Sequence, residues 1–205
     1  MIEPAGLYLH IPFCSAVCPY CDFAVRRGDT DAADAFADVL RREIDGVASG
    51  RLEPEADQLA DAVAELAAGR FDSIYLGGGT PSLLGDAALG SILDTLRRRF
   101  RLTDDARICF EANPEDLTPE RARSWRRLGV HMLSLGIQAL DGAALSALGR
   151  HHGVRDAAKA VDVARDAGFD TVSIDLIYGL PGQDEGNWTR QLDRALELPV
   201  DHISL

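Results

Sequence analysis

The sequence predicts an α/β fold built on a parallel sheet, either a curved β/α barrel or an open sheet. Its hydrophobic periodicity switches repeatedly between about 2 and about 3.6 residues, the pattern of alternating strands and helices. The strand-like runs are apolar at successive positions, as is typical of parallel strands covered on both faces. A length of 205 residues with 46% hydrophobic and 26% charged residues is ordinary for a globular domain, which argues against a disordered or fibrous chain.

Six short apolar runs are expected to form the strands. In chain order they are Leu7–Ile11, Ser73–Leu76, Arg107–Phe110, Met132–Ile137, Val172–Ile177 and His202–Leu205. Stretches of helical periodicity between them predict the helices, at Asp31–Val47, Pro54–Ala68, Asp86–Phe100, Pro119–Leu128, Val154–Ala167 and Glu185–Leu198. Strands separated by helices favour parallel strands joined by helical crossovers.

Residues at the helix ends support several of these predictions. Thr118 stands before Pro119, with Glu120 behind it, which provides an N-cap, a proline at the first helical position and an acidic first turn. Gly129 and Gly168 lie where two of the helices should end, and glycine is favoured at that position.

The whole chain, residues 1–205, is expected to form one core domain, because no internal repeat, low-complexity tract or interdomain linker interrupts it. Its last residues, Ile203-Ser204-Leu205, fall inside the sixth predicted strand, with no helix after it. A natural domain rarely ends within a strand. We therefore expect the chain to be truncated, with the C-terminal part of the natural protein missing.

The charge balance excludes some classes of function. With 21 basic and 33 acidic side chains the formal net charge is −12, which disfavours general binding to nucleic acids or anionic membranes. No apolar run approaches about 18 residues, so no transmembrane helix is expected. The N-terminus, from Met1 to Gly6, lacks the basic region and the long apolar stretch of a signal peptide. We therefore expect a cytoplasmic protein.

Three of the four cysteines lie together directly after the first predicted strand. Cys14, Cys18 and Cys21 form a CxxxCxxC motif, whereas Cys109 stands alone in a strand and is interpreted as a small buried hydrophobic residue. In a reducing compartment such a group favours a metal site over disulfides. Three thiolates can ligate three irons of a [4Fe–4S] cluster and leave the fourth iron open. Closed zinc sites use four ligands, so zinc is a weaker alternative, and three unrelated thiols are another.

A glycine triplet follows the second predicted strand. In Gly77-Gly78-Gly79-Thr80-Pro81 the backbone can approach a ligand closely and expose N–H groups suited to a carboxylate. A plain turn is the alternative. A phosphate-binding loop is excluded, because no Lys-Ser/Thr pair follows the glycines.

These features come together in a resemblance to a known family. The segment Tyr8–Phe23 resembles the opening of radical S-adenosylmethionine (SAM) proteins, most of all the oxygen-independent coproporphyrinogen III oxidase-like group and its haem chaperone branch. Later motifs extend the resemblance to the end of the chain. They are Leu76-Gly-Gly-Gly-Thr-Pro-Ser82, Phe110-Glu-Ala-Asn-Pro114, Leu133-Ser-Leu-Gly-Ile-Gln138, Leu148-Gly-Arg150 and Asp175-Leu-Ile-Tyr-Gly-Leu-Pro-Gly182.

The resemblance implies a partial (β/α)6 radical SAM barrel that binds a [4Fe–4S] cluster and SAM. One electron from the reduced cluster would cleave SAM to methionine and a 5′-deoxyadenosyl radical. The implied metal ligands are Cys14, Cys18 and Cys21, and the implied cofactor-binding residues are Tyr8, Tyr20, Gly78, Gly79, Thr80, Glu111, Gln138, Arg150 and Asp175. Taken alone, the polar residues among them would be interpreted as solvated or structural groups, and the two tyrosines as core residues. Gln138, Arg150 and Asp175 match positions that, in the oxidases, contact a second SAM molecule.

Two departures from the oxidases favour the haem chaperone branch. The oxidases carry an extra cysteine two residues after the third cluster ligand, where this chain has Phe23, and a long N-terminal extension ahead of the residue that matches Tyr8. We therefore expect a chaperone that binds haem and transfers it to client haemoproteins, with SAM and an electron donor as further partners. The alternative is an oxygen-independent coproporphyrinogen III oxidase, which forms protoporphyrinogen IX by oxidative decarboxylation. A zinc- or cluster-stabilised structural domain without SAM is a third hypothesis.

Overall fold

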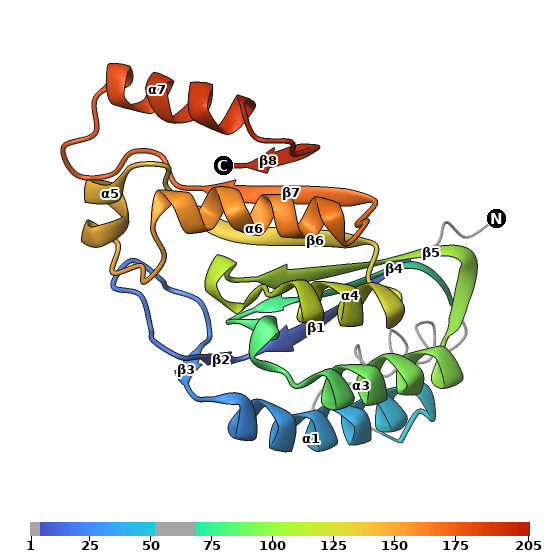
Figure 1. Ribbon diagram of the computed structural model, residues 1–205. Coiled ribbons are helices and arrows are strands. Elements are labelled where there is room, and N and C mark those ends of the chain that lie inside the picture. The colour runs from blue at the N-terminus through green and yellow to red at the C-terminus, as the bar shows by residue number, and fades with distance from the viewer. Residues whose placement is uncertain (1–4, 52–68) are drawn as a thin grey trace.

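Six parallel strands form one sheet in the computed structural model, which describes residues 5–51 and 69–205 (Figure 1). The strands are β1 (Ala5–Ile11), β4 (Arg70–Gly78), β5 (Arg101–Ala112), β6 (Met132–Gln138), β7 (Thr171–Leu176) and β8 (His202–Ser204). They are hydrogen-bonded in the order of the sequence. Sequential order is the arrangement of a β/α barrel, whereas a doubly wound open sheet reverses its order at a switch point. All six predicted strands are confirmed, and the sheet is of the barrel type.

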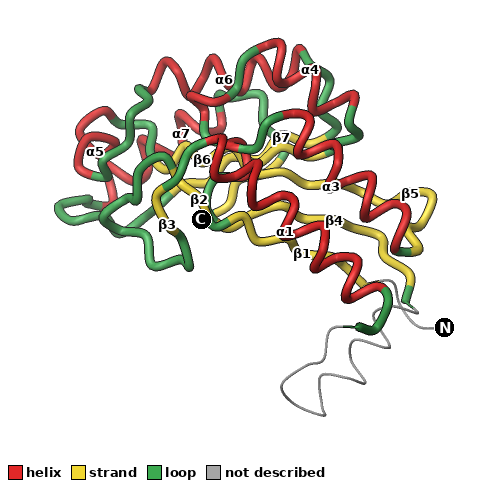
Figure 2. The backbone as a smooth tube through the Cα atoms, turned by 90° about the horizontal axis from the view of Figure 1, so that it is seen from below, coloured by secondary structure: helices red, strands yellow, loops and turns green. Residues whose placement is uncertain are grey.

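The helices lie along the outside of this sheet (Figures 1 and 2). They are α1 (Thr30–Ala48), α3 (Asp86–Arg99), α4 (Pro119–Arg127), α6 (Val154–Asp166) and α7 (Glu185–Leu196), and each confirms a predicted helix. The predicted helix at Pro54–Ala68 lies outside the described residues. A further helix, α5 (Gly142–Ala147), is not expected from the sequence, because a segment this short cannot show a helical period. Within residues 5–51 and 69–205, no helix has the length and apolarity needed to cross a membrane.

The helix ends follow the capping rules. The Thr118 hydroxyl accepts a hydrogen bond from the Arg121 amide at 3.3 Å and begins α4. Gly129 and Gly168 follow α4 and α6 with φ angles of 94° and 78°, a left-handed conformation that favours glycine at a helix end. The capping residues named in the sequence therefore delimit these two helices as predicted.

The two faces of the sheet differ in chemistry. The outer face carries Leu76, Phe110 and Leu133, which are fully buried beneath the helices, and Trp125 of α4 packs against Phe110 with ring centroids 4.9 Å apart. The inner face carries a row of polar side chains. Glu111 of β5 is in register with Ser134 of β6, and this residue is in turn in register with a polar residue of β7. The expectation that the strands are apolar on both faces is therefore wrong for the inner face. Alternate side chains of these strands point inward, where they are available to a site.

Two short strands close the loop that follows β1. β2 (Phe13–Cys14) pairs in parallel with β3 (Arg26–Arg27). The Arg26 amide donates to the Pro12 carbonyl at 2.7 Å, and the Gly28 amide donates to the Cys14 carbonyl at 2.9 Å. The cysteine loop, residues 14–25, is thus held together at its base.

Candidate functional site

A cavity of about 440 Å³ lies at the carboxyl ends of the strands, the end at which barrel proteins place their active sites. It brings together all but one of the site residues predicted from the sequence. They are Cys14, Cys18, Tyr20, Cys21, Gly78, Gly79, Thr80, Glu111, Gln138, Arg150 and Asp175. Residues scattered over more than 160 positions of the sequence therefore line one cavity, because parallel strands place their carboxyl ends, and the loops that follow them, at the same edge of the sheet.

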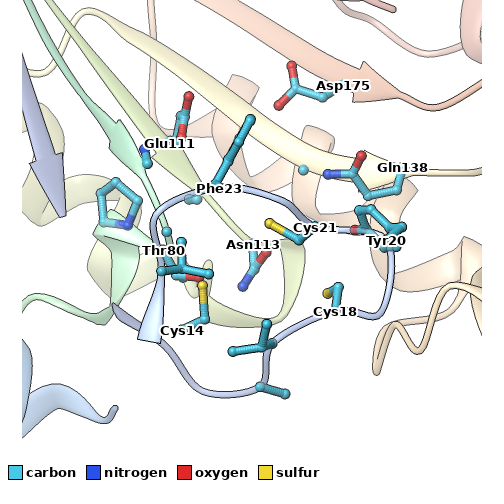
Figure 3. A pocket seen from close by; sticks show the side chains of 18 of the residues that line it. Cys14, Cys18, Tyr20, Cys21, Phe23, Thr80, Glu111, Asn113, Gln138 and Asp175 are labelled. Carbon is cyan, nitrogen blue, oxygen red and sulfur yellow. Dashed lines mark hydrogen bonds between the residues drawn. The ribbon is translucent and has the colours of Figure 1, made fainter. Parts of the chain in front are cut away.

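The three loop cysteines face this cavity. Cys14 ends β2, and a turn in which the Cys21 amide donates to the Cys18 carbonyl at 3.1 Å brings the other two together. In Figure 3 the three sulfur atoms border one space, with Asn113 beside it. The fourth cysteine, Cys109, is buried within β5 and does not line the cavity, as predicted.

The three thiols could each ligate a separate iron of a [4Fe–4S] cluster. Among the described residues, no group of three or more His, Cys, Asp or Glu side chains converges on one metal ion. A structural zinc site requires four ligands around one ion, whereas a [4Fe–4S] cluster presents a separate iron to each thiolate. Burial raises the pKa of the Cys14 thiol, and a hydrogen bond from Thr80 together with the charge of Arg150 partly offsets this rise.

The glycines at the end of β4 are required by close packing. A Cβ atom on Gly78, which has a φ of 109°, would lie 2.5 Å from the His10 ring. On Gly79 a Cβ atom would lie 2.6 Å from the Phe13 carbonyl oxygen. The glycine segment is thereby pressed against β1 and the base of the cysteine loop.

The same packing corrects one expectation about these glycines. The Gly79 amide donates to the Ile11 carbonyl at 2.8 Å, and the Thr80 amide donates to the Phe13 carbonyl at 2.7 Å. These N–H groups are not exposed for a carboxylate ligand, because they tie β4 to the loop after β1. The Gly78 amide instead donates to the Glu111 carboxylate at 3.2 Å, a bond that an incoming ligand could replace.

Glu111 is held at the end of β5 by two donors. One is the Gly78 amide, and the other is the Tyr75 hydroxyl, which donates to the carboxylate at 2.7 Å. Burial raises the pKa of Tyr75, and the neighbouring Glu111 carboxylate raises it further, so this hydroxyl remains a donor. Glu111 is therefore not the freely solvated carboxylate that its type alone would suggest.

Asp175 ends β7 on the same inner face. It accepts a hydrogen bond from the Ser134 hydroxyl at 3.0 Å. Burial raises the pKa of Asp175 to about 6, and the negative charge of Glu111 acts in the same direction. The Asp175 carboxyl group therefore loses its proton at a higher pH than an ordinary aspartate does.

Gln138 and Arg150 complete this wall. Gln138 has a φ of 68°, and among the described residues no other non-glycine residue has a positive φ. Such a conformation costs free energy and is concentrated at functional sites. The Arg150 guanidinium donates to the Asn113 side chain at 2.7 Å and to the Gly136 carbonyl at 2.9 Å, and it also reaches Cys18.

The two tyrosines differ in their placement. Tyr20 lines the cavity, whereas Tyr8 lies outside its lining and is 59% exposed, stacked on Tyr75 with ring centroids 5.9 Å apart. Sequence reasoning missed Tyr75 and Asn113 as lining residues. A period of two, counted back from the glycine triplet, places Tyr75 on the inner face, and Asn113 stands two residues after Glu111 in the same motif.

Comparison with known proteins gives the family independently of this geometry. The Radical SAM superfamily model matches residues 8–195. The chain is 39% identical over 203 residues to the Heme chaperone HemW of Mycobacterium tuberculosis, covering 98% of this chain and 49% of that protein. It is 34% identical over 205 residues to the Heme chaperone HemW of Escherichia coli, covering 99% of this chain and 50% of that protein. The chain therefore spans about half the length of the curated relatives it matches.

Among solved structures, coproporphyrinogen III oxidase (HemN) from Escherichia coli, described as a radical SAM enzyme, has the same fold over nearly the whole chain. The TM-score is 0.82 at 28% identity, and the match covers 98% of this chain and 44% of that one. The partial-barrel fold predicted from the sequence is thus confirmed. Because the family model spans most of the chain and includes all three loop cysteines, the chain belongs to the radical SAM superfamily.

Proposed function

We propose that this chain is the cluster- and SAM-binding core of a haem chaperone. The observation that carries the proposal is a single cavity in which the CxxxCxxC loop faces the ends of β4, β5, β6 and β7. The chaperone assignment is supported by relatives named Heme chaperone HemW, which are 39%, 34% and 31% identical to the chain in three bacteria.

The cysteine side of the cavity supports a [4Fe–4S] cluster. Cys14, Cys18 and Cys21 would each give one thiolate, and the loop has no fourth cysteine. One iron would therefore lack a protein ligand and remain open to a small molecule. When bound, the cluster and SAM supply the one-electron chemistry of the superfamily, while the chain binds, orients and shields them.

The opposite wall supports the binding of SAM. Its methionine part carries an ammonium, which a carboxylate of the protein can bind. Glu111 offers a carboxylate acceptor and already shares it with the Gly78 amide, so a ligand ammonium and that amide can compete for the same oxygen atoms. Gln138 and Asp175 add an amide and a second carboxyl group on the same wall.

Haem is the proposed cargo, and client haemoproteins are the proposed recipients. A low-potential electron donor is a further proposed partner, because the cluster must be reduced. We also propose a cytoplasmic location, where the four free cysteines would stay reduced.

A coproporphyrinogen III oxidase activity is the second candidate. The structural similarity to HemN favours it. The position of Phe23 disfavours it: this side chain lines the cavity and is 70% exposed, where the resemblance gives the oxidases a cysteine. Phenylalanine has no ionisable or redox-active group to take over the role of a thiol.

The binding proposal is tested by anaerobic reconstitution with iron and sulfide, followed by equilibrium dialysis with SAM. We expect about four irons per chain and saturable SAM binding. Glu111→Gln keeps the side-chain shape and an acceptor for Tyr75, yet it should weaken SAM binding by about 1–3 kcal/mol through the loss of charge. Glu120→Gln, an exposed change on α4, is the matched control. A chain that holds no iron would contradict the cluster assignment, and an unchanged SAM affinity in Glu111→Gln would remove Glu111 from the SAM site.

A further inference from the structure

We propose that Arg150 is a positioning residue for the iron–sulfur cluster, with its guanidinium directed at Cys18 so that it raises the reduction potential of the cluster. The inference rests on the proposed function, because it takes Cys18 as a cluster ligand. It assigns Arg150 a role toward the metal centre itself, in addition to the SAM contact that the family resemblance implies.

The guanidinium is fixed in place by two bonds from one of its ends. Nη2 donates to the Asn113 Oδ1 atom at 2.7 Å and to the Gly136 carbonyl at 2.9 Å. These partners belong to the ends of β5 and β6, so the plane of the group is set by the sheet. The other end is left to face the cysteine loop, and Nη1 lies 3.9 Å from the Cys18 Sγ atom.

The backbone before Arg150 packs on the same loop. Gly149 has a φ of 68°, and a Cβ atom there would lie 3.4 Å from Pro19, the residue after Cys18. The turn after α5 therefore rests on the cysteine loop and carries the arginine to it. Arg150 is brought to Cys18 from 132 positions away in the sequence by this packing.

Arg150 has no carboxylate among its direct hydrogen-bond or ion-pair partners in the described part of the chain. Both of its close acceptors, the Asn113 amide and the Gly136 carbonyl, are neutral, and within the described chain no carboxylate forms an ion pair with it. Glu115, the acid of the neighbouring turn, has its direct contact with His152, with Oε2 3.2 Å from Nδ1, and the more distant charge of Arg150 helps to lower the pKa of Glu115.

Simple electrostatics gives the direction of the effect. Reduction adds one electron to the cluster, with no bond formed or broken, and makes an already anionic group more negative. A nearby positive charge and an N–H···S hydrogen bond both stabilise the reduced state more than the oxidised state. Arg150 should therefore make the cluster easier to reduce by a weak electron donor.

The test is an EPR-monitored redox titration of the reconstituted chain without SAM, with dithionite as the reductant. Arg150→Met keeps the length of the side chain but removes its charge and donors. We expect its equilibrium constant for one-electron reduction to fall at least tenfold, a downward shift of about 59 mV in midpoint potential. Arg150→Lys and Asn113→Ala should each give a smaller downward shift, because one keeps the charge and the other loosens the guanidinium. Arg155→Met, an exposed change on α6, should leave the potential unchanged.

The outcomes separate this inference from the proposed function. A wild-type chain that holds no cluster would overturn the proposed function and this inference with it. A full complement of iron in Arg150→Met, with the wild-type potential, would overturn the role of Arg150 and leave the cluster assignment intact. If Arg150→Met loses the cluster altogether, the other two variants decide: wild-type potentials in both Arg150→Lys and Asn113→Ala contradict the inference, and lowered potentials support it.

Discussion

At the scale of single residues, the cavity is organised by charge. Glu111 and Asp175 lie near enough for the charge of Glu111 to raise the pKa of Asp175 further above the level that burial gives it. Arg150 brings a positive charge from the same wall to the cysteine loop, whose thiols would become thiolates on binding a metal. The site thus combines anionic groups that can receive an ammonium with a cation placed beside a sulfur ligand.

The first prediction concerns the cysteines. Replacing Cys14, Cys18 or Cys21 by serine should abolish the brown chromophore and the iron content, because a hydroxyl is a poor substitute for a thiolate ligand. Cys109→Ser should leave both intact. Burial raises the pKa of Cys109 to about 12, so it remains a thiol and a poor ligand. Iron lost in Cys109→Ser and kept in Cys14→Ser would show that the ligands are assigned wrongly.

The second prediction concerns the pH dependence of stability. The pKa of Asp175 is raised from 3.8 to about 6 in the folded chain, so the folded state binds its proton more tightly than the unfolded state does. The favourable contribution is complete below about pH 4 and is lost as the pH rises through about 6. Asp175→Asn should therefore stabilise the chain by about 1–3 kcal/mol at neutral pH and by little at about pH 4.

Urea unfolding across this pH range measures the effect, with the exposed Asp162→Asn on α6 as the control. The difference in unfolding free energy between Asp175→Asn and the wild type should grow between about pH 4 and 6 and then level off. A difference that is the same at all pH values would mean that Asp175 titrates normally.

Much of the site could be predicted from residue types and spacing, and the rest depends on packing. The CxxxCxxC spacing and the motifs at the strand ends name most of the residues that line the cavity. They do not show that the Gly79 and Thr80 amides are used up by the Ile11 and Phe13 carbonyls, because these bonds depend on how the loop after β1 returns to β4. The approach of Arg150 to Cys18 likewise depends on a turn that packs on Pro19.

At the scale of elements, α4 supports the ends of two strands. Its Trp125 packs on Phe110 of β5, the residue before Glu111. Its Arg121 donates to the Leu84 carbonyl at 3.1 Å and to the Asp116 carbonyl at 3.2 Å, in the loops after β4 and β5. The position of the helix is therefore coupled to that of the glycine segment and of the strand end that holds Glu111.

The third prediction follows from the cap of this helix. Thr118→Ala removes the acceptor for the Arg121 amide and should cost about 0.5–2 kcal/mol of stability. Ser124→Ala lies within the same helix and removes no side-chain hydrogen bond to any described residue, so it should not destabilise the chain, since alanine is the better helix former. Chemical denaturation of both variants measures the difference. Equal stability of the two variants would mean that the cap contributes nothing.

The elements themselves were largely accessible from the sequence, for identifiable reasons. Strands and helices long enough to show a period are found close to their predicted bounds, as for α4 and β6. The two-residue strands β2 and β3 carry no period, and their pairing depends on the chain returning after the cysteine loop. The polar inner face of the sheet was not anticipated either, because short apolar runs conceal an alternation in which every second residue is polar or small.

At the scale of the whole molecule, sequential strand order and a one-sided helix layer leave the inner face of the sheet free for the site (Figures 1 and 2). The formal charge of −12 disfavours binding of anionic polymers to the chain. Haem presents a large apolar macrocycle besides its two propionates, so a net negative charge does not oppose the proposed haem binding. Haem binding and oxidation of coproporphyrinogen are separated by assay.

The last prediction makes that separation. The anaerobically reconstituted full-length protein should bind haem stoichiometrically, measured by its absorbance spectrum on titration with haem. It should form no protoporphyrinogen IX from coproporphyrinogen III, even with SAM and dithionite, because Phe23 stands over the cavity where the oxidases are expected to carry a thiol. Chemical analysis of the porphyrins and of methionine released from SAM measures conversion, and the Cys14→Ser variant without cluster controls for unspecific reduction. Sustained turnover of coproporphyrinogen, with SAM consumed in proportion, would contradict the chaperone proposal and favour the oxidase.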